Sequence, residues 1–184
     1  MRIIGGALRG RTLFSPKGLA IRPTADRLRE SIFNIIGASV SGTSVLDLFA
    51  GTGALGLEAL SRGANSAVFI DISGKALALI GKNITALGLY EKAQVLRWDV
   101  RRNLDCLAQW PCRFSLVFMD PPYARNLVVP TLGHLRACGA LAQEALLVVE
   151  HASGEPIDPI SAGFSLDDNR QYAKTVVSFL RLAM

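Results

Sequence analysis

The chain has 184 residues, of which 50% are apolar and 19% are charged. This length and composition fit a single globular domain, residues 1–184, and exclude a disordered chain. Nowhere do about 18 apolar residues run without a charge, and the N-terminus lacks the apolar core of an export signal, so we expect no membrane association and a cytoplasmic location. Three cysteines at spacings that match neither a zinc site nor a redox pair favour reduced thiols and no bound metal.

The net charge of +5 is concentrated at one end of the chain. Residues 1–30 carry seven basic and two acidic groups, whereas the other 154 residues carry thirteen of each. A neutral body with a separate basic element is typical of proteins that bind a polyanion such as nucleic acid. A solvated arm without a ligand is the alternative.

Two elements are predicted ahead of the main alternation of strands and helices. Residues 3–14, inside a basic extension of residues 1–21, favour a short hairpin because glycines punctuate the apolar residues there. Residues 22–37 predict a helix with acidic residues near its start and Gly37 at its end. Its apolar stripe consists of Leu28, Ile32 and Ile36. We therefore expect its arginines to point away from that stripe.

From residue 44 to residue 184, short apolar runs alternate with segments of helix length. The predicted strands are residues 44–50, 66–71, 93–99, 114–120 and 145–150. The predicted helices are residues 54–62, 74–88, 101–109 and 127–137. Residues 164–182 indicate two strands joined without a helix. This order predicts an α/β fold with a Rossmann-like, mostly parallel sheet, helices on both faces and an antiparallel C-terminal strand.

A glycine-rich turn follows the first predicted strand, in the sequence DLFAGTGALG. Gly51, Gly53 and Gly56 match the G-x-G-x-x-G spacing, which lets bare backbone approach a bound cofactor. Asp71, 20 residues after Gly51, can accept hydrogen bonds from ribose hydroxyls of NAD or of S-adenosylmethionine (SAM). Asp47 would repel a diphosphate and attract the ammonium of a methionyl group. The turn therefore favours SAM, with an NAD-dependent reductase as the alternative.

Four successive predicted strands end in an aspartate. These residues are Asp47, Asp71, Asp99 and Asp120. Asp99 can accept a hydrogen bond from an adenine amino group, and a cap ahead of Arg101 is an equal interpretation. A row of carboxylates at one edge of the sheet suits a cationic sulfonium better than the phosphates of a dinucleotide.

The fourth predicted strand ends in a conformationally restricted segment, DPPY, residues 120–123. Proline fixes its own φ and restrains the residue before it, so the Asp120 carboxylate and the Pro121 carbonyl are held in place. Each can accept one N–H of an amino group, which leaves the nitrogen lone pair aimed at a methyl donor. Tyr123 can stack on an unpaired or flipped-out base. A rigid turn without chemistry is the alternative, and the motif alone leaves open which amine is methylated.

Other side chains have plainer interpretations. Glu58 and Arg62 are spaced as an ordinary i,i+4 helical pair. Trp98 is interpreted as a filler of the core or of a groove. Arg125 is either a contact to a phosphate or an exposed loop residue.

Several of these segments resemble a known family. VLDLFAGTG resembles motif I of class I SAM-dependent methyltransferases, with Phe49 where many relatives have glycine, and DPPY resembles motif IV of the amino-methylating branch. Nearly the whole chain resembles, segment by segment, the bacterial RsmD-type 16S rRNA guanine-N2 methyltransferases. The segments are RIIGGALRGRTL, RPTADRLRESIFNII, DLFAGTGALGLEALSRGA, FMDPPY and RQYAKTVVSFLRL. QYAKT departs from the pattern, because relatives often carry a glycine and an acid between Tyr172 and Thr175.

The resemblance implies a seven-stranded methyltransferase sheet, SAM as cofactor and 16S rRNA as substrate, free or within a 30S particle, with no obligate protein partner. The residues expected at the reacting amine are Asp120, Pro121, Pro122 and Tyr123. The residues expected at the cofactor are Asp47, Phe49, Ala50, Gly51, Gly53, Asp71, Ile72 and Asp99. The expected RNA contacts are Arg2, Arg9, Arg11 and Arg22. Another nucleic-acid amino-methyltransferase and an RNA-binding chaperone with a degenerate cofactor site are the remaining alternatives.

Overall fold

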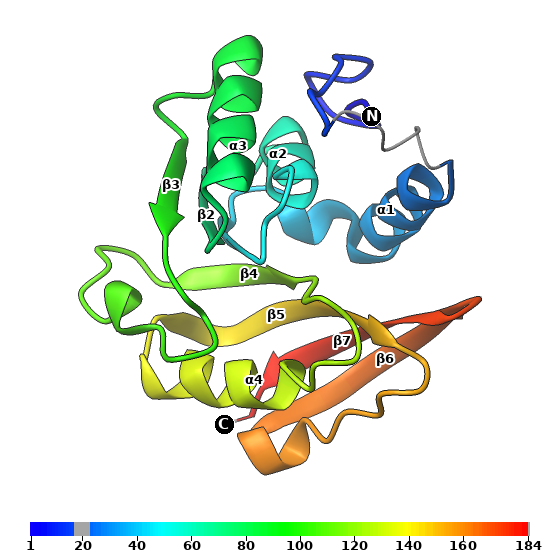
Figure 1. The fold of residues 1–184 in the computed structure, drawn as a ribbon, viewed down its shortest axis with the longest axis vertical. Helices are drawn as coiled ribbons and strands as arrows, with labels where there is room; N and C mark the ends of the chain where they lie inside the picture. The colour runs from blue at the N-terminus through cyan, green and yellow to red at the C-terminus, as the bar shows by residue number, and fades with distance from the viewer. Residues whose placement is uncertain (17–22, 184) are drawn as a thin grey trace.

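A computed structural model describes residues 1–16 and 23–183, without the side chains of residues 23–25. Arg22, one of the expected RNA contacts, lies outside these residues. Figure 1 shows the strands gathered in one sheet with helices packed against it. The strands are β1 (Ser44–Leu48), β2 (Ser66–Asp71), β3 (Ala93–Arg97), β4 (Phe114–Met119), β5 (Leu141–Ala152), β6 (Phe164–Tyr172) and β7 (Thr175–Leu182). The helices are α1 (Pro23–Ile36), α2 (Ala54–Ser61), α3 (Gly74–Leu87) and α4 (Val128–Ala137), with short 3-10 helices at Gly37–Val40, Asp105–Leu107 and Ile160–Ala162.

The strand order is β3-β2-β1-β4-β5-β7-β6. β1 to β5 pair in parallel, while β7 pairs antiparallel with both β5 and β6. The predicted sheet, parallel in its body and antiparallel at its C-terminal end, is confirmed. Among the described residues, no helix is long and apolar enough to cross a membrane.

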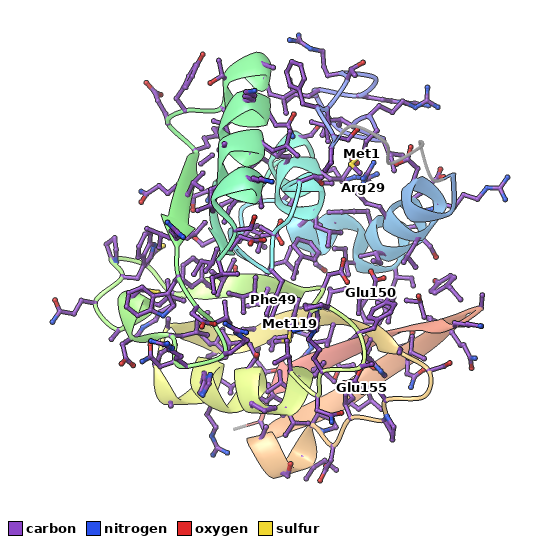
Figure 2. The ribbon with its side chains drawn as sticks, in the orientation of Figure 1. Met1, Arg29, Phe49, Met119, Glu150 and Glu155 are labelled. Atoms are coloured by element: carbon purple, nitrogen blue, oxygen red, sulfur yellow. The ribbon has the colours of Figure 1, made fainter. Side chains whose placement is uncertain are left out.

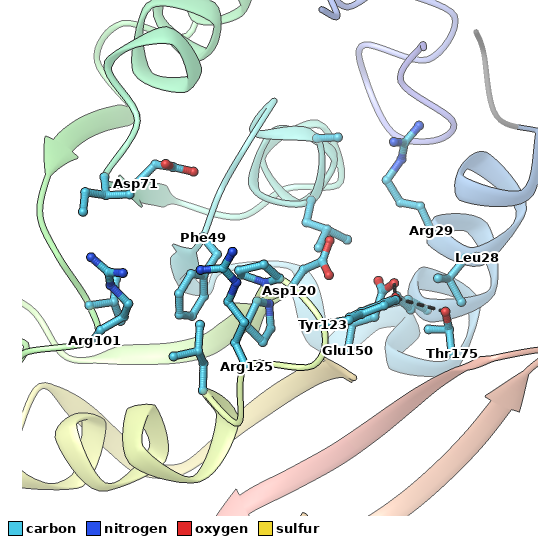
Figure 3. A pocket seen from close by; sticks show the side chains of 18 of the residues that line it. Leu28, Arg29, Phe49, Asp71, Arg101, Asp120, Tyr123, Arg125, Glu150 and Thr175 are labelled. Carbon is cyan, nitrogen blue, oxygen red and sulfur yellow. Dashed lines mark hydrogen bonds between the residues drawn. The ribbon is translucent and has the colours of Figure 1, made fainter. Parts of the chain in front are cut away.

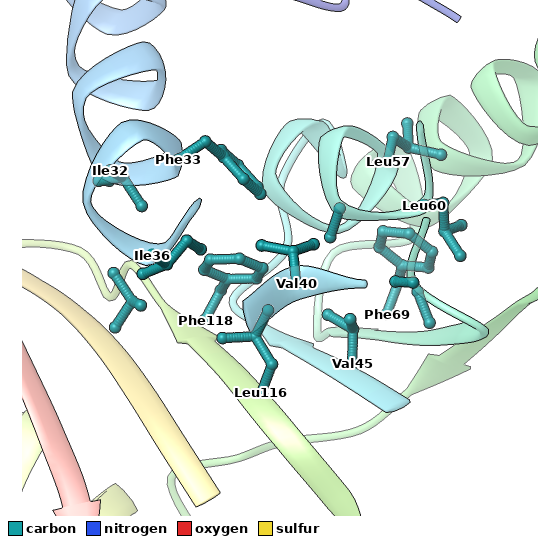
Figure 4. Close-up of a cluster of buried hydrophobic side chains, with 14 of the residues drawn as sticks. Ile32, Phe33, Ile36, Val40, Val45, Leu57, Leu60, Phe69, Leu116 and Phe118 are labelled. Atoms are coloured by element: carbon teal, nitrogen blue, oxygen red, sulfur yellow. The ribbon is translucent and has the colours of Figure 1, made fainter. Parts of the chain in front are cut away.

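The sheet buries both of its faces because side chains alternate along each strand. On β4, Phe118 belongs to the cluster covered by α1, α2 and α3, whereas Val117 and Met119 belong to the cluster covered by α4. Figure 4 shows Phe118 next to Phe33 of α1, with ring centroids 5.6 Å apart. The continuous apolar run that predicted a buried strand thus divides between two cores.

The prediction of a helix over residues 101–109 is wrong. Only a 3-10 helix, Asp105–Leu107, forms in this segment. The Asp99 carboxylate accepts a hydrogen bond from the Arg101 backbone N–H at 3.2 Å, and the Asn103 side chain accepts one from the Asp105 N–H at 3.2 Å. Such local side-chain acceptors compete with helical hydrogen bonds, so the leucine spacing does not decide the conformation.

The predicted N-terminal hairpin is reduced to one antiparallel bridge between Arg2 and Thr12. Backbone hydrogen bonds extend the pairing on either side, from Ile3 N–H to the Arg11 carbonyl at 2.9 Å and from Leu13 N–H to the Met1 carbonyl at 3.0 Å. Ile3 and Leu13 are buried, which anchors this basic segment on the body of the protein.

Glu58 of α2 holds the N-terminal segment against the body of the protein. Its carboxylate accepts hydrogen bonds from the backbone N–H groups of Ile4 at 2.8 Å and Gly5 at 2.7 Å. The predicted pair with Arg62 is present at 2.8 Å. Glu58 is also completely buried and holds the N-terminal backbone, so its role goes beyond an ordinary surface pair on a helix. Gly6 completes the contact, because a Cβ there would lie 1.9 Å from the Ser61 carbonyl oxygen.

The expectation that the α1 arginines point away from its apolar stripe is wrong for Arg29. This residue is 4% exposed, and its guanidinium donates to the Arg2 carbonyl at 2.6 Å and to Asp26 at 3.1 Å. Burial lowers the pKa of Arg29, while the charges of Asp26 and Glu58 oppose that change. Figure 2 shows Arg29 next to Met1, where α1 meets the N-terminal segment. The sequence could not show the contacts with Arg2 and Glu58, because those two residues come from other segments of the chain.

Candidate active site

A cavity of about 860 Å³ opens at the carboxyl ends of the parallel strands (Figure 3). The chain leaves β1 towards β2 on one side and returns to the other side of β1 as β4. Such a reversal of strand order leaves a crevice between the loops that follow the two strands. Phe49, after β1, and Asp120, after β4, both line this cavity. Its volume falls in the range of small-molecule sites.

The glycine turn after β1 depends on left-handed backbone at three positions. Phe49, Gly51 and Gly53 have φ values of 57°, 56° and 75°. A Cβ at Gly53 would also lie 3.2 Å from Ile80 and 3.3 Å from Phe69. Phe49 adopts a conformation that costs a non-glycine residue about 1–2 kcal/mol.

Asp71 secures the glycine turn from the end of β2. Its carboxylate accepts hydrogen bonds from Gly51 N–H at 2.9 Å and from Ser73 N–H at 2.8 Å. A carboxylate offers about four acceptor positions, so Asp71 keeps capacity for the hydroxyls of a ligand. Asp71 and the half-exposed Ile72 line the cavity. Ala50 donates its N–H to the Ile70 carbonyl at 3.1 Å and so joins the turn to β2.

Asp47 lies beneath the turn and is not among the residues that line the cavity. Its carboxylate is buried and accepts a hydrogen bond from Gly56 N–H at 2.9 Å. Burial, followed by the charges of Asp120 and Asp71, raises the pKa of Asp47 to about 8. At neutral pH this carboxyl is therefore mostly protonated, and its contribution is to the turn. Its expected attraction for an ammonium group stays a prediction.

Asp99 lines the cavity on the β3 side. The Arg101 guanidinium donates to both of its carboxylate oxygens at 2.8 Å, which, first among several causes, lowers the pKa of Asp99. The interpretation as a helix cap is wrong, because the described chain forms a turn directly after Asp99 and not a helix. A contact between Asp99 and the cofactor stays a prediction. Trp98, interpreted as a filler, lines the same wall and donates from its indole N–H to the Asn103 carbonyl at 3.0 Å.

The DPPY segment lies directly over the cavity. Asp120, Pro121, Pro122 and Tyr123 all line it. No described residue donates a hydrogen bond to the Asp120 carboxylate, which is left with acceptors for a ligand. Desolvation by the surrounding protein, followed by the negative charge of Glu150, raises the pKa of Asp120 to about 7.

The loop after Tyr123 is clamped by Glu155, a residue that the sequence did not single out. Its carboxylate accepts hydrogen bonds from Ala124 N–H at 3.0 Å and Asn126 N–H at 2.5 Å. Ala124 and Asn126 have φ values of 58° and 50°, so the loop is strained at Ala124, whereas asparagine tolerates this conformation. Arg125, between them, lines the cavity, as does Arg101.

Glu150 and Thr175 are cavity residues that sequence reasoning missed. Glu150 accepts a hydrogen bond from the Tyr123 hydroxyl at 2.6 Å, and Thr175 Oγ1 lies 3.0 Å from the same hydroxyl (Figure 3). Burial raises the pKa of Glu150 and, first among several causes, that of Tyr123. The available signal was position alone, because the predicted strands 114–120 and 145–150 end in Asp120 and Glu150; β5 itself continues to Ala152.

The N-terminal arginines predicted to contact RNA differ in their surroundings. Arg2 and Arg9 are exposed, and no described residue pairs with either guanidinium. Arg11 donates to the Ala86 carbonyl at 2.8 Å near the end of α3. Met1 lines the cavity, so the basic segment adjoins its rim.

Comparisons with known proteins agree with this geometry. A family model described as conserved hypothetical protein 95 matches residues 1–181. The ribosomal RNA small subunit methyltransferase D of Escherichia coli K12 is 40% identical over 90% of this chain and 82% of its own, and the enzyme of that name from Haemophilus influenzae is 35% identical over 85% and 81%. The solved structure of Escherichia coli yhhF superposes with a TM-score of 0.86 at 37% identity, covering 100% of this chain and 98% of that one.

The fold and the cavity define a class I SAM-dependent methyltransferase. The chain belongs to the family described as conserved hypothetical protein 95, and the resemblance to RsmD-type enzymes is confirmed. The cavity residues fit SAM, because the carboxylates of Asp71 and Asp99 offer acceptors to hydroxyl and amino groups. Ala50, Gly51 and Gly53 shape the turn but are not among the residues that line the cavity. When bound, SAM supplies a methyl group on a positively charged sulfur. Family membership favours this donor over the nicotinamide alternative.

Proposed function

We propose that this protein methylates the exocyclic N2 amine of a guanine in small-subunit rRNA. The observation that carries the proposal is the Asp120 carboxylate, which ends β4 next to a rigid proline pair and faces the cavity with its acceptors unused within the described chain. The names of the relatives support rRNA as the substrate. Guanine N2 is an inference from the resemblance and from the chemistry of the site.

An exocyclic amine on a purine is a poor nucleophile because its lone pair is conjugated with the ring. If the Asp120 carboxylate and the Pro121 carbonyl each accept one N–H, they fix the orientation of the amine and support its change towards tetrahedral geometry. Positive charge then grows on the nitrogen, and a carboxylate stabilises that state more than the starting state. Tyr123, which is 41% exposed, offers its ring to the base.

The basic N-terminal segment is proposed to hold the RNA through its phosphates. Arg2 and Arg9 are exposed, and the segment adjoins the rim of the cavity through Met1. Phosphate contacts orient a nucleic acid without reading its sequence. Selection of the target guanine is therefore assigned to the shape of the rRNA, free or within a 30S particle, together with the cavity itself.

The test is methyl transfer from labelled SAM to 30S particles and to naked 16S rRNA that lack the modification, followed by nucleoside analysis of the product. We expect label in N2-methylguanosine. Asp120→Ala should abolish turnover while the affinity for SAM changes little, and Glu144→Gln, an exposed glutamate of β5, serves as the control. Label only on adenine, on DNA or on protein would refute the proposal, as would an Asp120→Ala rate within tenfold of the wild type.

A further inference from the structure

Glu150 faces the cavity next to Asp120. β4 and β5 are parallel neighbours in which Met119 pairs with Val149, so the next residues, Asp120 and Glu150, lie side by side. Asp120 follows the end of β4, whereas Glu150 stays in β5 and pairs with Val177 of β7. Both residues line the cavity, and the negative charge of Glu150 contributes to the raised pKa of Asp120. The site therefore presents two carboxylates at the place where the substrate base must enter.

The Glu150 side chain is held in position by one of its two oxygens. Oε1 accepts the hydrogen bond from the Tyr123 hydroxyl at 2.6 Å, and Thr175 lies 3.0 Å from the other side of that hydroxyl. Within the described part of the chain, no donor is bonded to Oε2. Glu150 thus keeps a fixed acceptor for a ligand, and Figure 3 shows it next to the Tyr123 hydroxyl, which Thr175 also contacts.

We propose, building on guanine methylation as the proposed function, that Glu150 selects guanine by accepting its N1–H while Asp120 and Pro121 hold the 2-amino group. Guanine presents two neighbouring donors on this edge, N1–H and the amine. Adenine and cytosine carry a ring-nitrogen lone pair next to their amine, which an anionic oxygen repels. In their ionised forms the two carboxylates only accept hydrogen bonds, so the ionised pair matches guanine and opposes the other two bases.

The competing role for Glu150 is to position Tyr123 alone. Tyr123→Phe separates the two roles, because it removes the hydroxyl that Glu150 holds and leaves both carboxylate oxygens. Glu150→Gln should instead weaken base selection. Its amide can turn its NH₂ towards a ring-nitrogen lone pair or its carbonyl towards N1–H, so it accepts either kind of base edge. Base selectivity distinguishes the roles, whereas the overall rate does not.

The experiment compares rRNA that carries guanine at the mapped target with rRNA that carries 2-aminopurine there. 2-Aminopurine keeps the 2-amino group but has a lone pair at N1, and 6-thioguanine, which keeps N1–H and alters O6, is the matched control base. Methyl transfer is measured with SAM, and RNA affinity is measured by competition without SAM, so that base selection is also read independently of turnover.

We expect the wild type to prefer guanine over 2-aminopurine by at least about 100-fold, because a site built around a hydrogen bond rejects the analogue that lacks it. Glu150→Gln should reduce that ratio to within about tenfold, while Tyr123→Phe and the exposed Glu144→Gln control should keep it. Equal use of both bases by the wild type, or an unchanged ratio in Glu150→Gln, would overturn the inference. Label on adenine instead of guanine would refute the proposed function itself.

Discussion

Replacing the buried Glu58 with glutamine should destabilise the protein and release its N-terminal segment. The carboxylate is 0% exposed and accepts hydrogen bonds from Ile4 N–H, Gly5 N–H and the Arg62 guanidinium. Arg29 Nε lies 3.7 Å from Glu58 Oε2, and the Arg29 side chain is 4% exposed. Glutamine keeps one acceptor and turns an NH₂ group towards these donors. Arg62 then loses its carboxylate partner, and the buried Arg29 keeps only Asp26.

The magnitude follows from these contacts. A hydrogen bond to a charged group contributes about 1.5–3 kcal/mol, and removing one partner of a buried ion pair costs about 3–5 kcal/mol. Because one oxygen remains, we expect Glu58→Gln to lower the free energy of unfolding by about 3 kcal/mol. The effect should also reach the cavity, since both Met1 and Arg29 line it.

Urea unfolding followed by tryptophan fluorescence measures the free energy, and trypsin cleavage at Arg9 and Arg11 reports release of the segment. Glu30→Gln is the matched control, because Glu30 is an exposed glutamate of α1. We expect Glu58→Gln to be cleaved faster than either the wild type or this control. A loss below about 1 kcal/mol with unchanged cleavage would refute the view that Glu58 anchors the N-terminal segment.

Three other predictions follow from single positions. Burial raises the pKa of Asp47 to about 8, so the folded protein holds a proton that the unfolded chain releases, and wild-type stability should fall between about pH 4 and pH 8. Asp47→Asn should lack the share of this decline that Asp47 contributes, gaining up to about 1.4 kcal/mol per pH unit on the wild type in urea unfolding; parallel pH profiles would contradict it. Ala173 has a φ of 55°, so Ala173→Gly should stabilise the protein by about 0.5–1 kcal/mol, and no rise in Tm would contradict the strain. Replacing Arg9 and Arg11 with alanine should reduce the slope of log affinity for RNA against log salt by about 1.5, and an unchanged slope would favour a basic arm without a ligand.

The sequence predicted the strands well where local chemistry decided the structure. Apolar runs that end in an acid located the cavity edge, and both Asp71 and Asp120 line the cavity. The positive φ values of Phe49 and Ala173 were not predicted, because neither residue type signals left-handed backbone.

The sequence failed where partners are distant along the chain. Arg29 is buried because Glu58 and the Arg2 carbonyl meet it in space, which no helical pattern shows. Glu150 looked like the ordinary end of an apolar strand, and only the pairing of β4 with β5 places it next to Asp120. The helix predicted over residues 101–109 failed because side-chain acceptors bond the local backbone.

The position of the donor methyl group tests the central claim most directly. A crystal structure with SAM bound should place that methyl carbon at the end of β4, facing the space between the Asp120 carboxylate and the Pro121 carbonyl. An amine held by both acceptors would then lie about 3–3.5 Å from the methyl carbon, the separation of a reactive pair. A methyl group directed away from these acceptors, or a donor bound outside the cavity, would contradict amine methylation at this site.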